Sequence, residues 1–322
     1  MLLRQSRLAA LVAPFMILAC SGGGTDTAGD DVIGDGSAPE APADPLAQPQ
    51  AVSLFGEELY AQVDTTGAIA AADAALAAAP DDVELLIDAG RVRRNFWQYR
   101  RAIELYTEAT KLAPLDWRPY RFRGHRYISV REFDQAVIDL EAARERAPLN
   151  WDVSYHLGLA YFLTGRFGDA AEEYTRCIGL ADDPAALAAQ ADDFRSCSQN
   201  SADPESQIAM TEWAVRALLR DGRTAEAHVL LDGIPDDLAI GENVAYYHDL
   251  LFYKGVKTED ELLNPPEDAP YRLETVGMGV ANWLIVHGET ERARAVLEVL
   301  VADPWWPGFG RIAAEVELAR LP

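Results

Sequence analysis

A 34-residue period constrains the fold of this chain more than any other feature of its sequence. Glycines recur at this spacing at Gly56, Gly90, Gly124 and Gly158. Alanines and prolines keep the same period, at Ala68, Ala102, Ala136 and Ala170 and at Pro80, Pro114 and Pro148. Three residue types that share one period indicate a structural unit that is repeated along the chain.

The pattern resembles that of the tetratricopeptide repeat, which implies that the unit is a pair of antiparallel helices. Glycine and alanine suit the places where two helices approach closely, and bulky residues in step with them, such as Tyr106, Leu140 and Tyr174, fill the gaps beside them. Proline ends the second helix because it lacks the N–H group and clashes with the preceding turn. One pair cannot cover its own apolar face, so neighbouring pairs must stack into a solenoid.

The second half of the chain keeps the pattern in a weaker form. Turn glycines stand at Gly165, Gly222, Gly255 and Gly288. We predict units at 83–116, 117–150, 151–184, 208–240, 241–273 and 274–306, a degenerate first unit at 49–82, and a capping helix from Phe309 to Leu321. Residues 185–207 interrupt the period, and Pro265-Pro266 shortens one second helix. The repeats therefore fall into an N-terminal group, 52–184, and a degenerate C-terminal group, 208–322.

This pattern resembles the tetratricopeptide repeat family, closely over 83–182 and loosely beyond. The resemblance implies an all-α superhelical solenoid that acts as a non-catalytic scaffold, with the first helices lining a concave groove. Some members of the family grip a terminal carboxylate with Lys, Asn and Arg at five groove positions. The matching residues here are Ile87, Arg91, Phe122, Asp152 and His156. That carboxylate clamp is absent from the sequence, so the groove is expected to bind something else.

Register within the repeats gives the candidate partner-binding groove. Its residues are Arg91, Arg94 and Asn95 in the first strong repeat, Arg118, Arg121 and His125 in the second, and Tyr155, Leu159 and Phe162 in the third. The groove is predicted to run from a cationic stretch into an apolar, aromatic one.

The charge distribution points to the same region. The chain has 28 basic and 52 acidic residues, a net charge of −24, which argues against a general nucleic-acid binder. Residues 91–147 nevertheless contain 13 basic and 8 acidic residues, a net charge of +5. One interpretation is that this basic island is a docking site for carboxylates or another anion. The alternative is that these arginines pair with the chain's own acids, such as Glu104 and Glu108.

The N-terminus has the pattern of an export signal. Arg4 and Arg7 precede an apolar run at 8–19, which is too short to span a bilayer. The run ends in Ile17-Leu18-Ala19-Cys20, which resembles the lipobox of bacterial lipoproteins. The resemblance implies a signal peptide at 1–19 and lipidation of Cys20, with an ordinary signal peptide as the alternative. Residues 20–51, with six acids and no base, read as a flexible tether.

The remaining reactive side chains indicate no catalytic or metal site. The five histidines are scattered without metal-binding spacing, and no cofactor is predicted. Once Cys20 is lipidated, Cys177 and Cys197 remain. Two cysteines in an exported protein suggest a disulfide. The alternative is that Cys177, which stands in the slot of Ala75, Ala109 and Ala143, is a small buried residue.

The sequence therefore predicts a lipid-anchored scaffold that binds a protein or peptide partner in the bacterial cell envelope. Ser21 after the lipidated cysteine favours the outer membrane, facing the periplasm. A binder of a small anionic ligand or cell-wall fragment is the first alternative. An envelope enzyme is the second.

Overall fold

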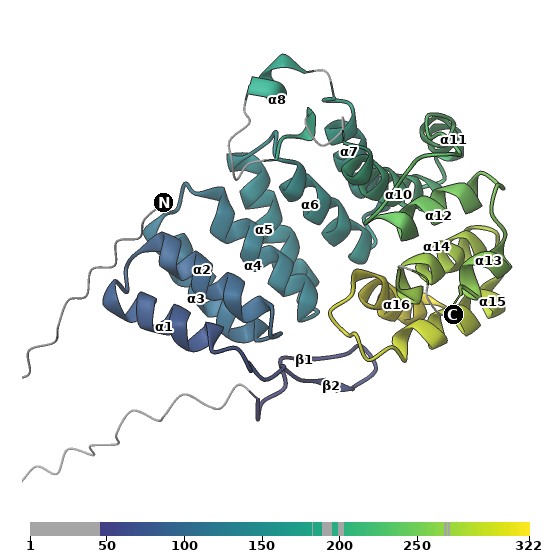
Figure 1. Cartoon of the computed structure of the whole chain (residues 1–322). Helices are drawn as coiled ribbons and strands as arrows, with labels where there is room; N and C mark the ends of the chain where they lie inside the picture. Colours follow the sequence, from purple (N-terminus) through teal and green to yellow (C-terminus); the bar gives the residue numbers. More distant parts are fainter. Residues whose placement is uncertain (1–45, 182, 189–194, 199–202, 267–268, 270) are drawn as a thin grey trace, which may run out of the picture. The chain divides into compact units, whose positions relative to one another are not determined.

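Antiparallel helix pairs make up most of the described chain, in the order that the repeat predicts (Figure 1). The computed structural model describes residues 46–181, 183–188, 195–198, 203–266, 269 and 271–322. The predicted signal peptide, Cys20 and nearly all of the tether lie outside the described residues.

The three strong repeats form the predicted pairs. The first helices are α2 (Val83–Arg94), α4 (Trp117–Ser129) and α6 (Trp151–Leu163), and the second helices are α3 (Tyr99–Leu112), α5 (Phe133–Arg146) and α7 (Phe167–Ile178). Each first helix begins after a residue whose side chain accepts hydrogen bonds from its first backbone N–H groups, namely Asp82, Asp116 and Asn150. Because these caps also recur every 34 residues, the period fixes where each repeat begins.

The periodic glycines of these repeats lie where the two helices of a pair cross. Gly90, Gly124 and Gly158 face Tyr106, Leu140 and Tyr174. A Cβ atom on Gly124 would lie 2.7 Å from Cγ of Leu140, closer than carbon atoms pack. The predicted division into small and bulky positions is therefore confirmed for the three strong repeats.

The predicted degenerate pair at 49–82 is wrong in its first half. A short hairpin takes the place of a first helix, with β1 (Ala51–Val52) antiparallel to β2 (Glu58–Leu59), followed by α1 (Ala68–Ala78). Gly56 lies in the hairpin turn with φ of +84° rather than at a helix crossing. Its place in the 34-residue period therefore has a different physical cause, the left-handed backbone of a tight turn.

The degenerate repeats also form helix pairs. They comprise α10 (Pro204–Arg220) with α11 (Thr224–Asp232), α12 (Val244–Tyr253) with the short α13 (Glu259–Leu263), and α14 (Leu273–Val286) with α15 (Thr290–Val301). The helix α8 (Pro184–Ala188) precedes them, and α16 (Phe309–Arg320) ends the array. The helix α13 stops just before Pro265-Pro266, as the sequence predicts.

The turn inside each pair has a left-handed residue at its centre. Gly165, Gly222, Gly255 and Gly288 have φ between +75° and +80°. The same position in the first two strong repeats holds Trp97 and Arg131, with φ of 59° and 64°. A side chain in this region costs backbone energy that glycine avoids. These two turns are therefore strained in a way the other turns are not.

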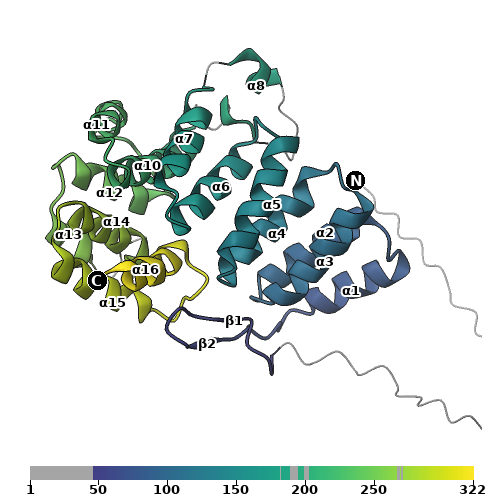
Figure 2. The ribbon, with the colours of Figure 1, turned by 180° about the vertical axis from the view of Figure 1, so that it is seen from behind.

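The described residues belong to one compact unit, and in it α16 shares an apolar cluster with the strong repeats. Figure 2 shows α16 beside the hairpin and the ends of the strong repeats, as Figure 1 does from the other side. One apolar cluster includes Ile128 of α4, Phe162 of α6, Trp213 of α10 and Ile312 of α16. No helix in the described part is long and apolar enough to cross a membrane.

Candidate functional site

The first helices of the strong repeats present one continuous face. Arg118 Nη1 of α4 donates to Glu84 Oε2 of the preceding repeat at 3.0 Å. The His125 ring of α4 and the His156 ring of α6 have centroids 4.3 Å apart. We call this surface the first-helix face; its residues are Arg91, Arg94, Asn95, Arg118, Arg121, His125, Asp152 and His156. The structure thus brings together the predicted residues of the first two strong repeats.

The centre of the first-helix face carries excess positive charge. Arg94 on this face and the neighbouring buried Arg126 form no ion pair with a carboxylate in the part of the chain that the structure describes, whereas Arg91 pairs with Asp88 at 3.4 Å. The Arg126 guanidinium is buried over the Tyr99 ring, 4.7 Å from its centroid. The guanidinium carbons of Arg91 and Arg121 lie over the Phe122 ring, 5.9 and 5.0 Å from its centroid. An arginine cluster on aromatic rings is a favourable setting for an anion.

The protonation equilibria fit this arrangement. Burial lowers the pKa of Arg94, and the guanidinium groups of Arg121 and Arg91 lower it further. Burial likewise lowers the pKa of Arg126 to about 10 and that of His156 to about 3, and it lowers the pKa of His125 well below its usual value. Both histidines are therefore neutral at pH 7, and arginines supply the positive charge.

Several basic residues of 91–147 pair with the chain's own acids, which is the alternative that the sequence left open. On α3, Arg101 pairs with Glu104 at 2.6 Å and Lys111 with Glu108 at 2.7 Å. Arg118 is held by both Asp116 and Glu84, which raise its pKa. Arg121 pairs with Asp152. Internal acids thus neutralise much of the island and leave the centre of the face as its cationic part.

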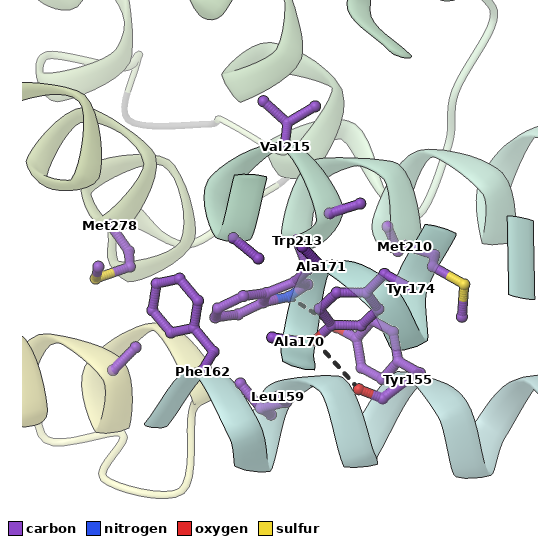
Figure 3. Close-up of a cluster of buried hydrophobic side chains, with 14 of the residues drawn as sticks. Tyr155, Leu159, Phe162, Ala170, Ala171, Tyr174, Met210, Trp213, Val215 and Met278 are labelled. Atoms are coloured by element: carbon purple, nitrogen blue, oxygen red, sulfur yellow. Dashed lines mark hydrogen bonds between the residues drawn. The ribbon is translucent and has the colours of Figure 1, made fainter. Parts of the chain in front are cut away.

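The prediction of an apolar, aromatic end of the groove is wrong for Leu159 and Phe162. Leu159 and Phe162 are 0% exposed, and Tyr155 is 7% exposed. Figure 3 shows all three in the core beside Trp213 of α10, whose Nε1–H donates to the Tyr155 hydroxyl at 3.1 Å. The reason is that the degenerate repeats stack directly on α6 and cover these residues. Leu159 and Phe162 therefore lie in the core and not on a groove surface.

A cavity of about 580 Å³ adjoins the first-helix face. Its lining includes Arg121, His125, Asp152, Tyr155, His156, Tyr246 and Phe309, so the predicted Tyr155, although only 7% exposed, borders this cavity. The Nδ1 atom of His125 is buried without a hydrogen-bond partner within the described residues. Tyr246 and Phe309 come from the degenerate half, which sequence register alone could not bring to this place. The positions of Asp152 and His156 in the third strong repeat, by contrast, already predict that they face the groove.

The two cysteines of the described chain are joined to each other. Cys177 and Cys197 form a disulfide, and both are fully buried. The bond fastens the short stretch at 195–198 beside the third strong repeat, where Asn150 and Ser196 form an isolated antiparallel bridge. Within the described ranges, His, Cys, Asp and Glu side chains form no group of three or more that could hold a metal ion.

Comparison with known proteins supports a repeat protein of the tetratricopeptide type. Residues 123–186 match the sequence model of the tetratricopeptide repeat family. Over 94 residues the chain is 34% identical to the small glutamine-rich tetratricopeptide repeat-containing protein 2 of Saccharomyces cerevisiae. The match covers 29% of this chain, and the chain spans about a quarter, 27%, of the length of that relative.

Two solved structures match this chain over most of their own length. A crystal structure of MamA has a TM-score of 0.41 and 20% identity, covering 59% of this chain and 91% of MamA. The structure of YrrB, described as a TPR protein with an unusual peptide-binding site, has a TM-score of 0.42 and 14% identity, covering 71% of this chain and 98% of YrrB. The fold described above is an all-α solenoid of tetratricopeptide type.

Proposed function

We propose that this chain is a non-catalytic scaffold that binds an anionic segment of a protein or peptide partner. Solenoids of stacked helix pairs generally present extended surfaces for protein–protein interaction. One observation carries the proposal: Arg94, which forms no ion pair among the described residues, lies beside Arg91 and Arg121, so that two carboxylates, Asp88 and Asp152, are shared among three guanidinium groups. A partner's carboxylates would relieve this like-charge repulsion and accept paired hydrogen bonds from the guanidinium groups.

The second part of the proposal concerns where in the cell the protein is anchored. We propose that Cys20 carries the lipid anchor and that the acidic tether holds the repeats near the membrane of the cell envelope, on the periplasmic side of the outer membrane. Several acyl chains on one residue hold far more firmly than a single chain. Cys20→Ala is expected to release the protein from membranes after a carbonate wash. A variant that stays in the membrane pellet would contradict the anchor.

The binding proposal is tested by crosslinking and affinity capture of the mature protein in its own cells. Arg91→Ala with Arg94→Ala is expected to lower capture at least tenfold without loss of helix content by circular dichroism. The matched control is Arg101→Ala with Lys111→Ala, which removes the same charge from α3, where both residues are paired with Glu104 and Glu108. Equal capture by both double variants and the unaltered protein would refute the proposal.

A small anionic ligand or cell-wall fragment is the second candidate, and the 580 Å³ cavity beside Arg121 favours it. The two candidates differ in what copurifies from detergent-solubilised membranes. A protein supports the scaffold, whereas a bound sugar or peptide fragment detected by mass spectrometry supports the small-ligand site. Turnover that depends on a histidine would be required for an enzyme.

A further inference from the structure

The turns of the three strong repeats line up along the C-terminal segment, defined here as residues 302–320. Trp97, Arg131 and Gly165 occupy the same position of successive repeats, and each turn contacts this segment. At the first turn, the Trp97 ring lies edge-on to Trp305 and Trp306, with centroids 5.1 and 5.5 Å away.

The second and third turns make polar contacts with the same segment. Arg131 Nη2 donates to the carbonyl oxygen of Trp306 at 3.1 Å and to Glu315 Oε1 at 2.5 Å. At the third turn, Arg320 Nη2 donates to the carbonyl oxygen of Leu163 at 2.6 Å, and Gly165 leaves room for its guanidinium. The contacts follow chain order, from Trp305 at the first turn to Arg320 at the third. The segment therefore runs along the row of turns.

Backbone strain coincides with two of these contacts. In the degenerate repeats, the left-handed residue at the centre of each turn is a glycine, namely Gly222, Gly255 or Gly288. The two non-glycine residues in that conformation, Trp97 and Arg131, both grip the C-terminal segment through their side chains. A strained conformation persists where surrounding contacts hold it. The contacts of these two side chains account for the absence of glycine at the two turns.

The same attachment brings Phe309 onto the first-helix face. The Phe309 ring has its centroid 5.1 Å from that of His125 and 5.8 Å from that of His156. The segment around it is held from the other side by the hairpin, because Trp306 Nε1 donates to the carbonyl oxygen of Tyr60 at 3.2 Å and Arg311 pairs with Glu57. Phe309 thus covers the His125 end of the face.

We propose that the C-terminal segment is an intramolecular ligand of the row of turns and that Phe309 competes with any partner for the His125 end of the first-helix face. The attachment itself does not depend on the function proposed above. The competition rests on that function and concerns where on the face a partner binds.

Amide hydrogen exchange read by mass spectrometry tests the attachment. Trp306→Ala is expected to speed exchange at least tenfold at the turns 95–98 and 129–132 while α5 and α7 keep their rates. Arg320→Ala, a change at an exposed residue, is expected to act only at 163–166. Tyr120→Ala is the control, because Tyr120 lies at the opposite end of α4 and packs on Arg123 and Arg146. Wild-type exchange at all three turns in both variants would overturn the attachment.

The anionic aromatic dye 8-anilinonaphthalene-1-sulfonate tests the covering by Phe309. Phe309→Ala is expected to bind the dye at least fivefold more tightly than the unaltered protein, and adding Arg121→Gln is expected to remove the gain. Phe252→Ala, which changes a partly buried ring of α12, is the control. Equal affinity for Phe309→Ala and the unaltered protein would overturn the covering. Neither measurement uses a partner, so a failed capture experiment leaves both results interpretable.

Discussion

Arg131 and Glu315 form an ion pair with both side chains almost fully buried, 3% and 1% exposed, although 184 residues separate them. Two guanidinium nitrogens contact the carboxylate, Nη2 at 2.5 Å and Nε at 3.1 Å. Removal of one partner leaves a buried charge uncompensated, so Glu315→Gln is expected to lower the free energy of unfolding by about 3 kcal/mol or more.

A double-mutant cycle in urea checks this value. Arg131→Met together with Glu315→Gln is expected to cost less than the sum of the single changes, because it removes the Arg131 charge that Glu315→Gln leaves without its partner, while Arg311, which also contacts Glu315 at 3.4 Å, keeps its ion pair with Glu57. Additive costs would contradict the direct coupling of the two side chains.

The left-handed backbone of Trp97 predicts an inverted preference between alanine and glycine. Trp97→Gly is expected to destabilise the protein less than Trp97→Ala, by about 1 kcal/mol, because both lose the indole contacts but only glycine relieves the strain. At Arg101, inside α3, the order is expected to reverse, with glycine worse than alanine by about 1 kcal/mol. Urea unfolding of the four variants checks both signs. The same order at both positions would show that Trp97 is unstrained.

A buried charged cluster in the degenerate repeats predicts a pH dependence. Glu212 and Arg216 of α10 and Asp249 of α12 are all 0% exposed, and Arg216 contacts both carboxylates. Burial raises the pKa of Glu212 to about 7 and raises that of Asp249 well above its usual value. The nearby hydroxyl groups of Tyr174, Tyr246 and Tyr253 are neutral at pH 7, because burial raises their pKa values.

The sign follows from proton binding. Between about pH 4.5 and pH 7 the folded state keeps a proton on Glu212 that the unfolded state has lost, so this contribution to stability falls as pH rises. Because the lowered pKa values of His125 and His156 act in the opposite direction below about pH 6.5, the useful measurement is a difference between variants. Glu212→Gln is expected to gain stability relative to the unaltered protein as pH rises from 5 to 8. A pH-independent difference would contradict the raised pKa of Glu212.

The disulfide between Cys177 and Cys197 predicts a redox-dependent stability. The cysteines are 20 residues apart, and opening a loop of this size is expected to cost about 3 kcal/mol. Alkylation without reduction, followed by mass measurement, is expected to leave both cysteines unmodified. Two alkylated thiols in the unreduced protein would rule out the bond.

The strong repeats were predictable because their signals are local. Asp82 and Asp116 cap the first helices one residue before the predicted unit starts at 83 and 117. Gly56 misled the assignment because a hairpin turn and a helix crossing both require glycine, for different reasons. Sequence spacing alone does not distinguish a missing Cβ from a left-handed backbone.

The candidate site was predictable only in part. Repeat register places Glu84 one period before Arg118, so their ion pair could have been found from the sequence. The burial of Leu159 and Phe162 could not, because it depends on how degenerate repeats stack on α6. The approach of Phe309 to His125 depends on rotations accumulated over several helix pairs, which no local pattern encodes.

The contact between the C-terminal segment and the first turns restricts how this chain can change in length. An open-ended solenoid tolerates the gain or loss of a unit, since each unit touches only its neighbours. Here an added or deleted helix pair would carry Glu315 away from Arg131 and Trp306 away from Trp97. The number of repeats is therefore fixed by the need for the two ends to meet, as the number of strands is fixed in a closed barrel.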